Sequence, residues 1–146
     1  CWDAIAEARE LVSLPIIANG DVWSVNDAFR CLAVTGCDAL MLGRGVLCRP
    51  DLPRLIAAAA ICGEPGESLH WPDITPLLAH FFELNLLHYD ARNAGNPLKQ
   101  WLVYLRGYFP QAALLFEQIK RLRAPEDIRS ILQQALPPIA AKRCAA

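Results

Sequence analysis

The sequence lacks any apolar run long enough to cross a membrane as a helix, which takes about 20 residues. The longest candidate, "LIAAAAICG", is short and rich in alanine. The opening residues, "CWDAIAEARE", are acidic and polar, so they do not resemble a signal peptide. We therefore expect a cytoplasmic protein with no membrane contact.

Metal and disulfide frameworks are missing as well. Six cysteines stand at positions 1, 31, 37, 48, 62 and 144; no two form a Cys-x-x-Cys pair, and no histidine lies at zinc-ligand spacing from a cysteine pair. Cys31 and Cys37 fall inside apolar segments. This pattern predicts reduced, mostly buried thiols and no metal site.

An initiator methionine is also absent, and the first residues read as the interior of a helix. We therefore expect the chain to be a piece of a longer protein. Its 146 residues, 54% of them hydrophobic, suffice for one packed domain or two small ones and argue against disorder.

The net charge of −1 conceals a strong asymmetry along the chain. Residues 1–96 carry 6 Lys and Arg against 12 Asp and Glu, whereas residues 97–146 carry 8 against 3. A basic region of this kind suggests an anionic partner. A solvated basic surface without a partner remains an open alternative.

Helices and strands alternate over the first part of the sequence. Helical patterns cover residues 3–12, 25–35 and about 51–62, and continuous apolar runs at 14–19 and 39–42 read as strands buried on both faces. This alternation predicts a parallel sheet with crossover helices.

No strand pattern follows the linker-like "GEPGES". Helices are expected to begin at Pro72 or Pro76, at Pro97 with Asn96 as its cap, and at two further prolines, 110 and 125. The spacing of Trp101 and the leucines after it predicts a face turned to the core. We expect an α/β region over residues 1–65 and a separate all-helical domain over residues 66–146.

Both predicted strands end at a glycine beside a charged residue. The first ends in Asn19-Gly20-Asp21 and the second in Gly43-Arg44. Loops at the carboxyl ends of parallel strands carry ligand sites, and the loops after strands 7 and 8 of eight-stranded barrels are a recurrent phosphate site. Glycine permits close backbone approach and Arg supplies a fixed cationic fork. The pair of loops therefore predicts a phosphate-binding site.

The stretch "LPIIANGDVWSVNDAFRCLAVTGCDALMLGRGVLCRPDL" resembles the end of the barrel in tRNA-dihydrouridine synthases. These flavin mononucleotide (FMN) enzymes reduce selected uridines in tRNA and carry a small helical domain after the barrel. The resemblance covers nearly the whole chain. It implies the last two βα units of a TIM (β/α)8 barrel, with strands 7 and 8 in residues 1–65, followed by a helical tRNA-binding bundle in residues 66–146.

The resemblance implies which residues hold the flavin phosphate: Asn19, Gly20, Asp21, Gly43 and Arg44. It also implies NADPH as the reductant and a monomeric full-length enzyme. The catalytic cysteine of the family lies in an Asn-Cys-Gly-Cys-Pro-like loop on an earlier strand, and no such motif occurs here. We therefore expect no catalytic residue in this chain and no activity from it alone. Its histidines, at 70, 80 and 88, are expected to be core or surface residues.

The segments "LKQWLVYLR" and "LFEQIKRLR" resemble the C-type subfamily, which modifies uridine 16 of the D-loop. That resemblance implies tRNA contacts by Lys99, Tyr104 and Lys120. A further subfamily arginine, two residues before the lysine, is Pro97 here. Arg92 in the preceding turn could supply the missing charge.

Two other interpretations stay open on the sequence. The first is a stand-alone RNA-binding helical module that carries a vestigial barrel edge and performs no catalysis. The second is another flavin-phosphate barrel, such as an oxidase of small hydroxy acids, although such an enzyme has no need of a basic helical tail. The coding sequence upstream of Cys1 would separate the enzyme from the binding module.

Overall fold

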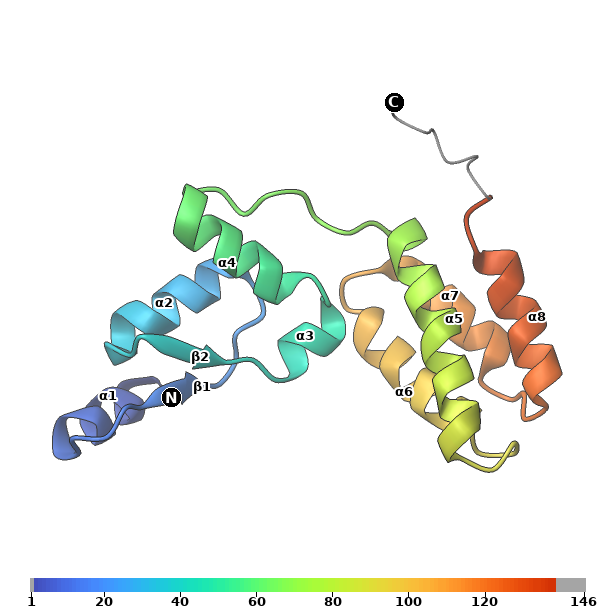
Figure 1. Ribbon diagram of the computed structural model, residues 1–146, viewed down its shortest axis with the longest axis horizontal. Coiled ribbons are helices and arrows are strands. Elements are labelled where there is room, and N and C mark those ends of the chain that lie inside the picture. Colours follow the sequence, from blue (N-terminus) through green and yellow to red (C-terminus); the bar gives the residue numbers. More distant parts are fainter. Residues whose placement is uncertain (1, 139–146) are drawn as a thin grey trace. The chain divides into compact units, whose positions relative to one another are not determined.

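The computed structural model describes residues 2–138 and divides the chain into two units, Cys1–Ser68 and Leu69–Ala146 (Figure 1). The division falls after residue 68, near residue 65, where the sequence places the domain boundary. Among the helices of residues 2–138, none combines the length and the apolar character that crossing a membrane requires.

In the first unit, helices alternate with two short strands. The order is α1 (Trp2–Leu11), β1 (Ile17–Asn19), α2 (Val25–Thr35), β2 (Ala39–Met41), α3 (Arg44–Cys48) and α4 (Leu52–Cys62). The strands pair in parallel, with Ala18 opposite Leu40. Helix α2 is the crossover between them and packs on both strands, on α1 and on α4 (Figure 1). The predicted βαβ arrangement is therefore present, whereas the five-residue α3 directly after β2 was not predicted.

Both ends of α2 are capped by residues close in the sequence. The Asp27 N–H donates to Ser24 Oγ at 3.0 Å, and the Ser24 hydroxyl donates to the Asp27 carboxylate at 2.8 Å. The helix ends at Gly36, whose φ of 65° is left-handed. Cys31 and Cys37 are buried free thiols, as their apolar settings predict, whereas Cys48 is half-buried and Cys62 is exposed. Burial, with a smaller contribution from Cys37, raises the pKa of the Cys31 thiol.

The prediction that both faces of the strands are buried is wrong for this structure. Ala18 is fully buried, but Ile17 is 56% exposed and Met41 57% exposed. Successive strand residues point to opposite faces of a sheet. The helices cover one face of this two-stranded sheet, and within residues 2–138 the other face remains open.

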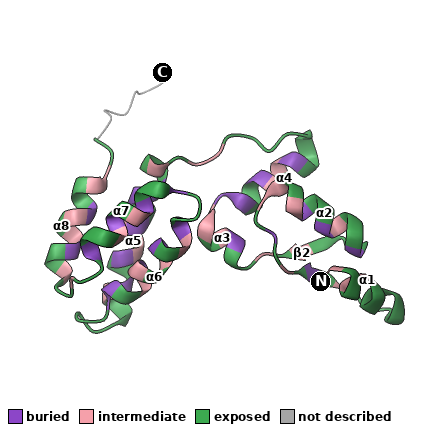
Figure 2. Ribbon diagram, turned by 180° about the vertical axis from the view of Figure 1, so that it is seen from behind, coloured by how far each residue is buried: buried purple, intermediate pink, exposed green. Residues whose placement is uncertain are grey.

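The second unit is a bundle of four helices: α5 (Trp71–His88), α6 (Gly95–Leu105), α7 (Pro110–Ile119) and α8 (Pro125–Ala135). Each helix packs on two others, α5 on α6 and α8, and α7 on α6 and α8 (Figure 1). Figure 2 shows the buried residues gathered on the inner faces of these helices. Leu102 and Leu105 are fully buried, and the Trp101 ring packs edge-on against Phe81 with ring centroids 5.1 Å apart, which confirms the predicted core face.

Of the two predicted starts of α5, Pro72 agrees with the structure to within one residue and Pro76 is wrong. Helix α5 begins at Trp71 and continues through Pro76 without a break, because the Thr75 hydroxyl donates to the Pro72 carbonyl that Pro76 cannot use. Helix α6 has Ala94 as its N-cap, so the predicted Asn96 cap is wrong. Residues 91–94 already form turns, so the helix begins before Asn96.

Candidate functional site

The two strand-end loops of the first unit meet in one hollow of about 260 Å³. All five residues that the sequence predicts for a phosphate site line it. They are joined there by residues outside that set; the lining comprises Asn19, Gly20, Asp21, Val22, Trp23, Met41, Gly43, Arg44 and Gly45. The loops meet because β1 and β2 are neighbours and parallel, so their carboxyl ends lie at the same edge of the sheet.

The loop after β1 has an unusual backbone that a side chain from α1 holds in place. Gly20 has φ 133°, a conformation that suits glycine, and Asp21 has a left-handed φ of 50°. The Trp2 indole Nε1 donates to the Gly20 carbonyl at 2.7 Å. This hydrogen bond joins residues 18 positions apart and fixes the turn, a contact that local sequence patterns do not reveal.

Gly45, in the first turn of α3, packs closely against the loop after β1. A Cβ atom at this position would lie 2.1 Å from the Val22 carbonyl oxygen, which is much closer than atoms tolerate. A Cβ atom at Gly43, in contrast, would meet nothing within 4 Å. The second glycine of "GRG" is therefore the one that packing requires, although the sequence-based site includes only the first.

Arg44 lines this hollow and has two close neighbours. Its Nη2 is 3.5 Å from Asp21 Oδ1, and its guanidinium carbon lies 5.6 Å from the centre of the Trp23 ring. The Arg44 and Asp21 side chains are 67% and 74% exposed, so the pair adds little stability. Asp21 and the Trp23 ring together orient the Arg44 guanidinium. Trp23 was missed in the sequence, where its signal is only its place two residues after Asp21.

Beyond this hollow, Arg49 ties the start of α4 to the end of the linker. Its Nε lies 3.3 Å from Oδ1 of the fully buried Asp51, and its Nη2 donates to Ser68 Oγ at 2.8 Å. Arg54 donates to the Glu67 carbonyl at 2.7 Å. These contacts hold the linker against the first unit.

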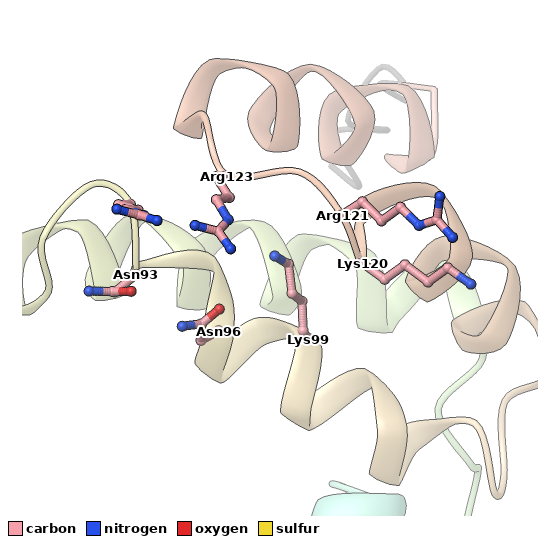
Figure 3. Close-up of a pocket in the computed structure, with 7 residues that line it drawn as sticks. Asn93, Asn96, Lys99, Lys120, Arg121 and Arg123 are labelled. Carbon is pink, nitrogen blue, oxygen red and sulfur yellow. The ribbon is translucent and has the colours of Figure 1, made fainter.

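A larger hollow, of about 760 Å³, lies in the helical unit (Figure 3). The turn between α5 and α6, the first turns of α6, and the turn between α7 and α8 surround it. Every residue that lines it is cationic or an amide, and no carboxylate is among them; the lining comprises Arg92, Asn93, Asn96, Lys99, Lys120, Arg121 and Arg123. We call this region the basic hollow.

Two lysines of the basic hollow have different surroundings. The Lys99 ammonium donates to the Leu122 carbonyl at 2.6 Å and so joins α6 to the turn before α8. Burial, followed by the charge of Arg123, lowers the pKa of Lys99. The exposed Lys120 instead pairs with Glu117 one turn earlier in α7.

Comparison with known proteins identifies the family. The family profile described as dihydrouridine synthase (Dus) matches residues 1–140. The chain belongs to the dihydrouridine synthase family. The resemblance found in the sequence is thereby confirmed.

Several curated members of the dihydrouridine synthase family are similar to this chain, and those cited here are each named tRNA-dihydrouridine(16) synthase. The Aquipseudomonas alcaligenes protein is 39% identical over 94% of this chain and 42% of its own length. The Pseudomonas syringae pv. tomato protein is 40% identical over 82% of this chain and 38% of its own length. The Escherichia coli K12 protein is 36% identical over 90% of this chain and 40% of its own length. The chain thus spans less than half the length of the curated relatives it matches.

The structure brings together some of the residues that the C-type dihydrouridine synthases suggest for tRNA binding. Lys99 and Lys120 both line the basic hollow, whereas the half-buried Tyr104 is not among its lining residues. Arg92 lines the hollow as well. Pro97, which stands in place of a subfamily arginine, lies in the first turn of α6. Within residues 2–138, no group of three or more His, Cys, Asp or Glu side chains could hold a metal ion.

Proposed function

We propose that the chain is the C-terminal part of a flavin-dependent tRNA-dihydrouridine synthase, an oxidoreductase that reduces uridine 16 of the D-loop to 5,6-dihydrouridine. In this proposal β1 and β2 are strands 7 and 8 of a TIM barrel, and the helical unit binds tRNA. The observation that carries it is the meeting of the two strand-end loops in one hollow that Arg44 helps to line. Family membership and the names of the relatives support the same reading.

The residues of the strand-end hollow fit the phosphate of FMN. A phosphate needs donors and positive charge in a small space. Arg44 supplies charge and donors, and Gly20 and Gly43 line the same hollow of about 260 Å³. Asp21 would accept from the Arg44 guanidinium and turn it toward the phosphate, with Trp23 behind it. Bound flavin would supply the hydride for the uracil ring, with NADPH as the source of electrons.

The basic hollow fits the backbone of an RNA. Phosphate contacts by Lys and Arg supply much of the affinity of proteins for nucleic acids. Five cationic side chains line this hollow without a carboxylate among them. We assign Lys99 and Lys120 to phosphate contacts, and the half-buried Tyr104 to the orientation of the RNA near the hollow.

The stand-alone RNA-binding module remains the second candidate, and the closed core of the helical unit favours it. A module without catalysis has no reason to keep the strand-end hollow, with Gly45 against the Val22 carbonyl and Arg44 held by Asp21. We therefore rank it below the enzyme.

The experiment that separates these candidates uses a full-length protein that includes this chain. The protein is purified and its flavin content measured, and it is then incubated with unmodified tRNA and NADPH. Mass spectrometry of nuclease fragments should detect dihydrouridine at position 16 of the D-loop. Binding of tRNA without flavin and without dihydrouridine would establish the binding module instead.

A further inference from the structure

The cationic side chains of the basic hollow fall into two groups. Figure 3 shows the Lys99 ammonium pointing toward Arg123, with Asn93 and Asn96 on the same side, whereas Lys120 and Arg121 extend in the opposite direction. The charge of Arg123 acts on Lys99, which agrees with their closeness in this view. The hollow therefore has two groups of side chains. We call Arg92, Asn93, Asn96, Lys99 and Arg123 the inner part, and Lys120 and Arg121 the outer pair.

The inner part brings like charges together without a protein partner to balance them. Within residues 2–138, neither Arg92 nor Arg123 forms an ion pair, although the structure pairs Lys120 with Glu117 and Arg129 with Glu83. Carboxylates are thus available on these helices but lie outside the lining of the hollow. Like charges repel in a partly desolvated space, and an anion between them relieves that repulsion.

The inner part is also held in shape before any ligand arrives. The hydrogen bond from Lys99 to the Leu122 carbonyl fixes the turn that carries Arg123 against α6. Gly95 lets this end of α6 approach α8, because a Cβ atom there would lie 2.6 Å from Ile128 Cδ1. A site whose donors are fixed in advance loses less entropy on binding.

We infer that Arg92, Asn93, Asn96, Lys99 and Arg123 form a seat for a single phosphodiester group of an RNA backbone, separate from the outer pair Lys120 and Arg121. This inference rests on the proposed function, since the tRNA supplies the phosphodiester. All five side chains can donate hydrogen bonds, and three of them carry positive charge. A tetrahedral oxyanion with several acceptor oxygens matches that set. The two guanidinium groups, which come from different turns, share the one group.

The test measures binding of unmodified tRNA by the 146-residue chain over a range of salt concentrations. The variants are Arg92→Gln, Arg123→Gln and their combination, and the control is Arg106→Gln, an exposed cation of the same unit that does not line the hollow. Circular dichroism verifies that every variant keeps the helix content of the parent.

Sharing of one phosphodiester predicts a particular pattern. Each single variant should bind about tenfold more weakly at low salt, yet keep most of the salt dependence, since the other arginine still neutralises the group. The double variant keeps only the Lys99 ammonium, which already donates to the Leu122 carbonyl. It should therefore lose most of one phosphate contact, which lowers the slope of log K against log salt by up to roughly 0.7 to 0.9. Arg106→Gln should leave both the affinity and the slope close to those of the parent.

Two results would overturn this inference while leaving tRNA binding by the helical unit intact. If the parent binds tRNA and the double variant behaves like Arg106→Gln, no phosphate lies in the inner part. If the slope of log K against log salt falls in the double variant by about the amount expected for two phosphate contacts, the two arginines hold separate phosphates. Absence of tRNA binding by the parent at low salt, in contrast, would remove the RNA-binding part of the proposed function, and the seat with it.

Discussion

The two units of this chain differ in how they complete their cores. In the helical unit, the four helices pack in a closed cycle around thirteen buried residues, including Phe82, Leu98 and Ile119. The α/β unit has a buried cluster of five, of which the largest side chain is that of Val22. It exposes apolar side chains elsewhere, with Leu14 73% and Leu11 84% exposed.

This contrast shows whether each candidate site is complete within the described residues. The basic hollow is built entirely by α6 and by turns of a unit whose core is closed, so it is complete within these residues. The strand-end hollow lies on a sheet of two strands, and two strands cannot close a barrel. We expect binding of the flavin ring to depend on segments outside this chain. Binding of an RNA phosphate in the basic hollow should not depend on them.

The largest expected effect tests the comparison of the two cores. Leu102 is fully buried in the helical unit, so Leu102→Ala should lower the free energy of unfolding of that unit by about 3 to 5 kcal/mol. The matched change Leu14→Ala in the α/β unit should alter the free energy of unfolding by less than about 0.5 kcal/mol, because Leu14 is 73% exposed. Urea unfolding followed by circular dichroism measures both. Equal losses would mean that Leu14 is covered in solution.

The next effect concerns the contact between the two strand-end loops. Gly45→Ala places a Cβ atom 2.1 Å from the Val22 carbonyl, so the backbone must shift. We expect a loss of about 1 to 3 kcal/mol in the stability of the α/β unit. Gly43→Ala is the matched control, since its Cβ atom meets nothing within 4 Å. Thermal unfolding of the two variants separates them, and equal melting temperatures would disprove the close approach.

An effect of similar size falls on the binding of the proposed cofactor. In a full-length protein that includes this chain, Arg44→Ala should weaken flavin mononucleotide binding by about 1.5 to 3 kcal/mol, because a charge-assisted contact to the phosphate is lost. Arg54→Ala provides the control, since Arg54 donates to the Glu67 carbonyl and does not line the hollow. Flavin absorbance after gel filtration gives the occupancy. A fully occupied Arg44→Ala protein would rule out the phosphate contact.

The sequence predicts the parts of this structure that depend on local patterns. The strands end in glycine beside Asp21 and Arg44, so their meeting follows from parallel pairing, which the alternation of elements already predicts. The helices at Pro110 and Pro125 begin where proline fits the first turn.

The parts that could not be predicted arise from contacts between distant segments. The Trp2 indole reaches the Gly20 carbonyl, and the Gly45 backbone meets Val22, through packing that no short motif records. In the same way, the charge change after residue 96 predicts a basic surface, but the gathering of Arg92 and Arg123 around Lys99 depends on two turns that pack together.

The smallest expected effects distinguish two of the residues proposed to contact tRNA. Lys120 is exposed and paired with Glu117, so Lys120→Ala should weaken binding of every tRNA alike, by a few-fold, and lower the salt slope by about one unit or less. A phosphate contact carries no sequence information, and part of the Lys120 charge is already neutralised by Glu117.

Tyr104 is half-buried on α6 and does not line the basic hollow, so Tyr104→Ala should leave the salt slope unchanged. Its expected effect lies in the orientation of the tRNA, because an aromatic ring next to a basic surface can stack on an unpaired base. In a full-length protein, dihydrouridine at position 16 should therefore decrease more than tRNA affinity does. Tyr104→Phe should retain the modification, since it keeps the ring. If Tyr104→Ala lowers affinity and modification in equal proportion, the residue contributes to binding alone.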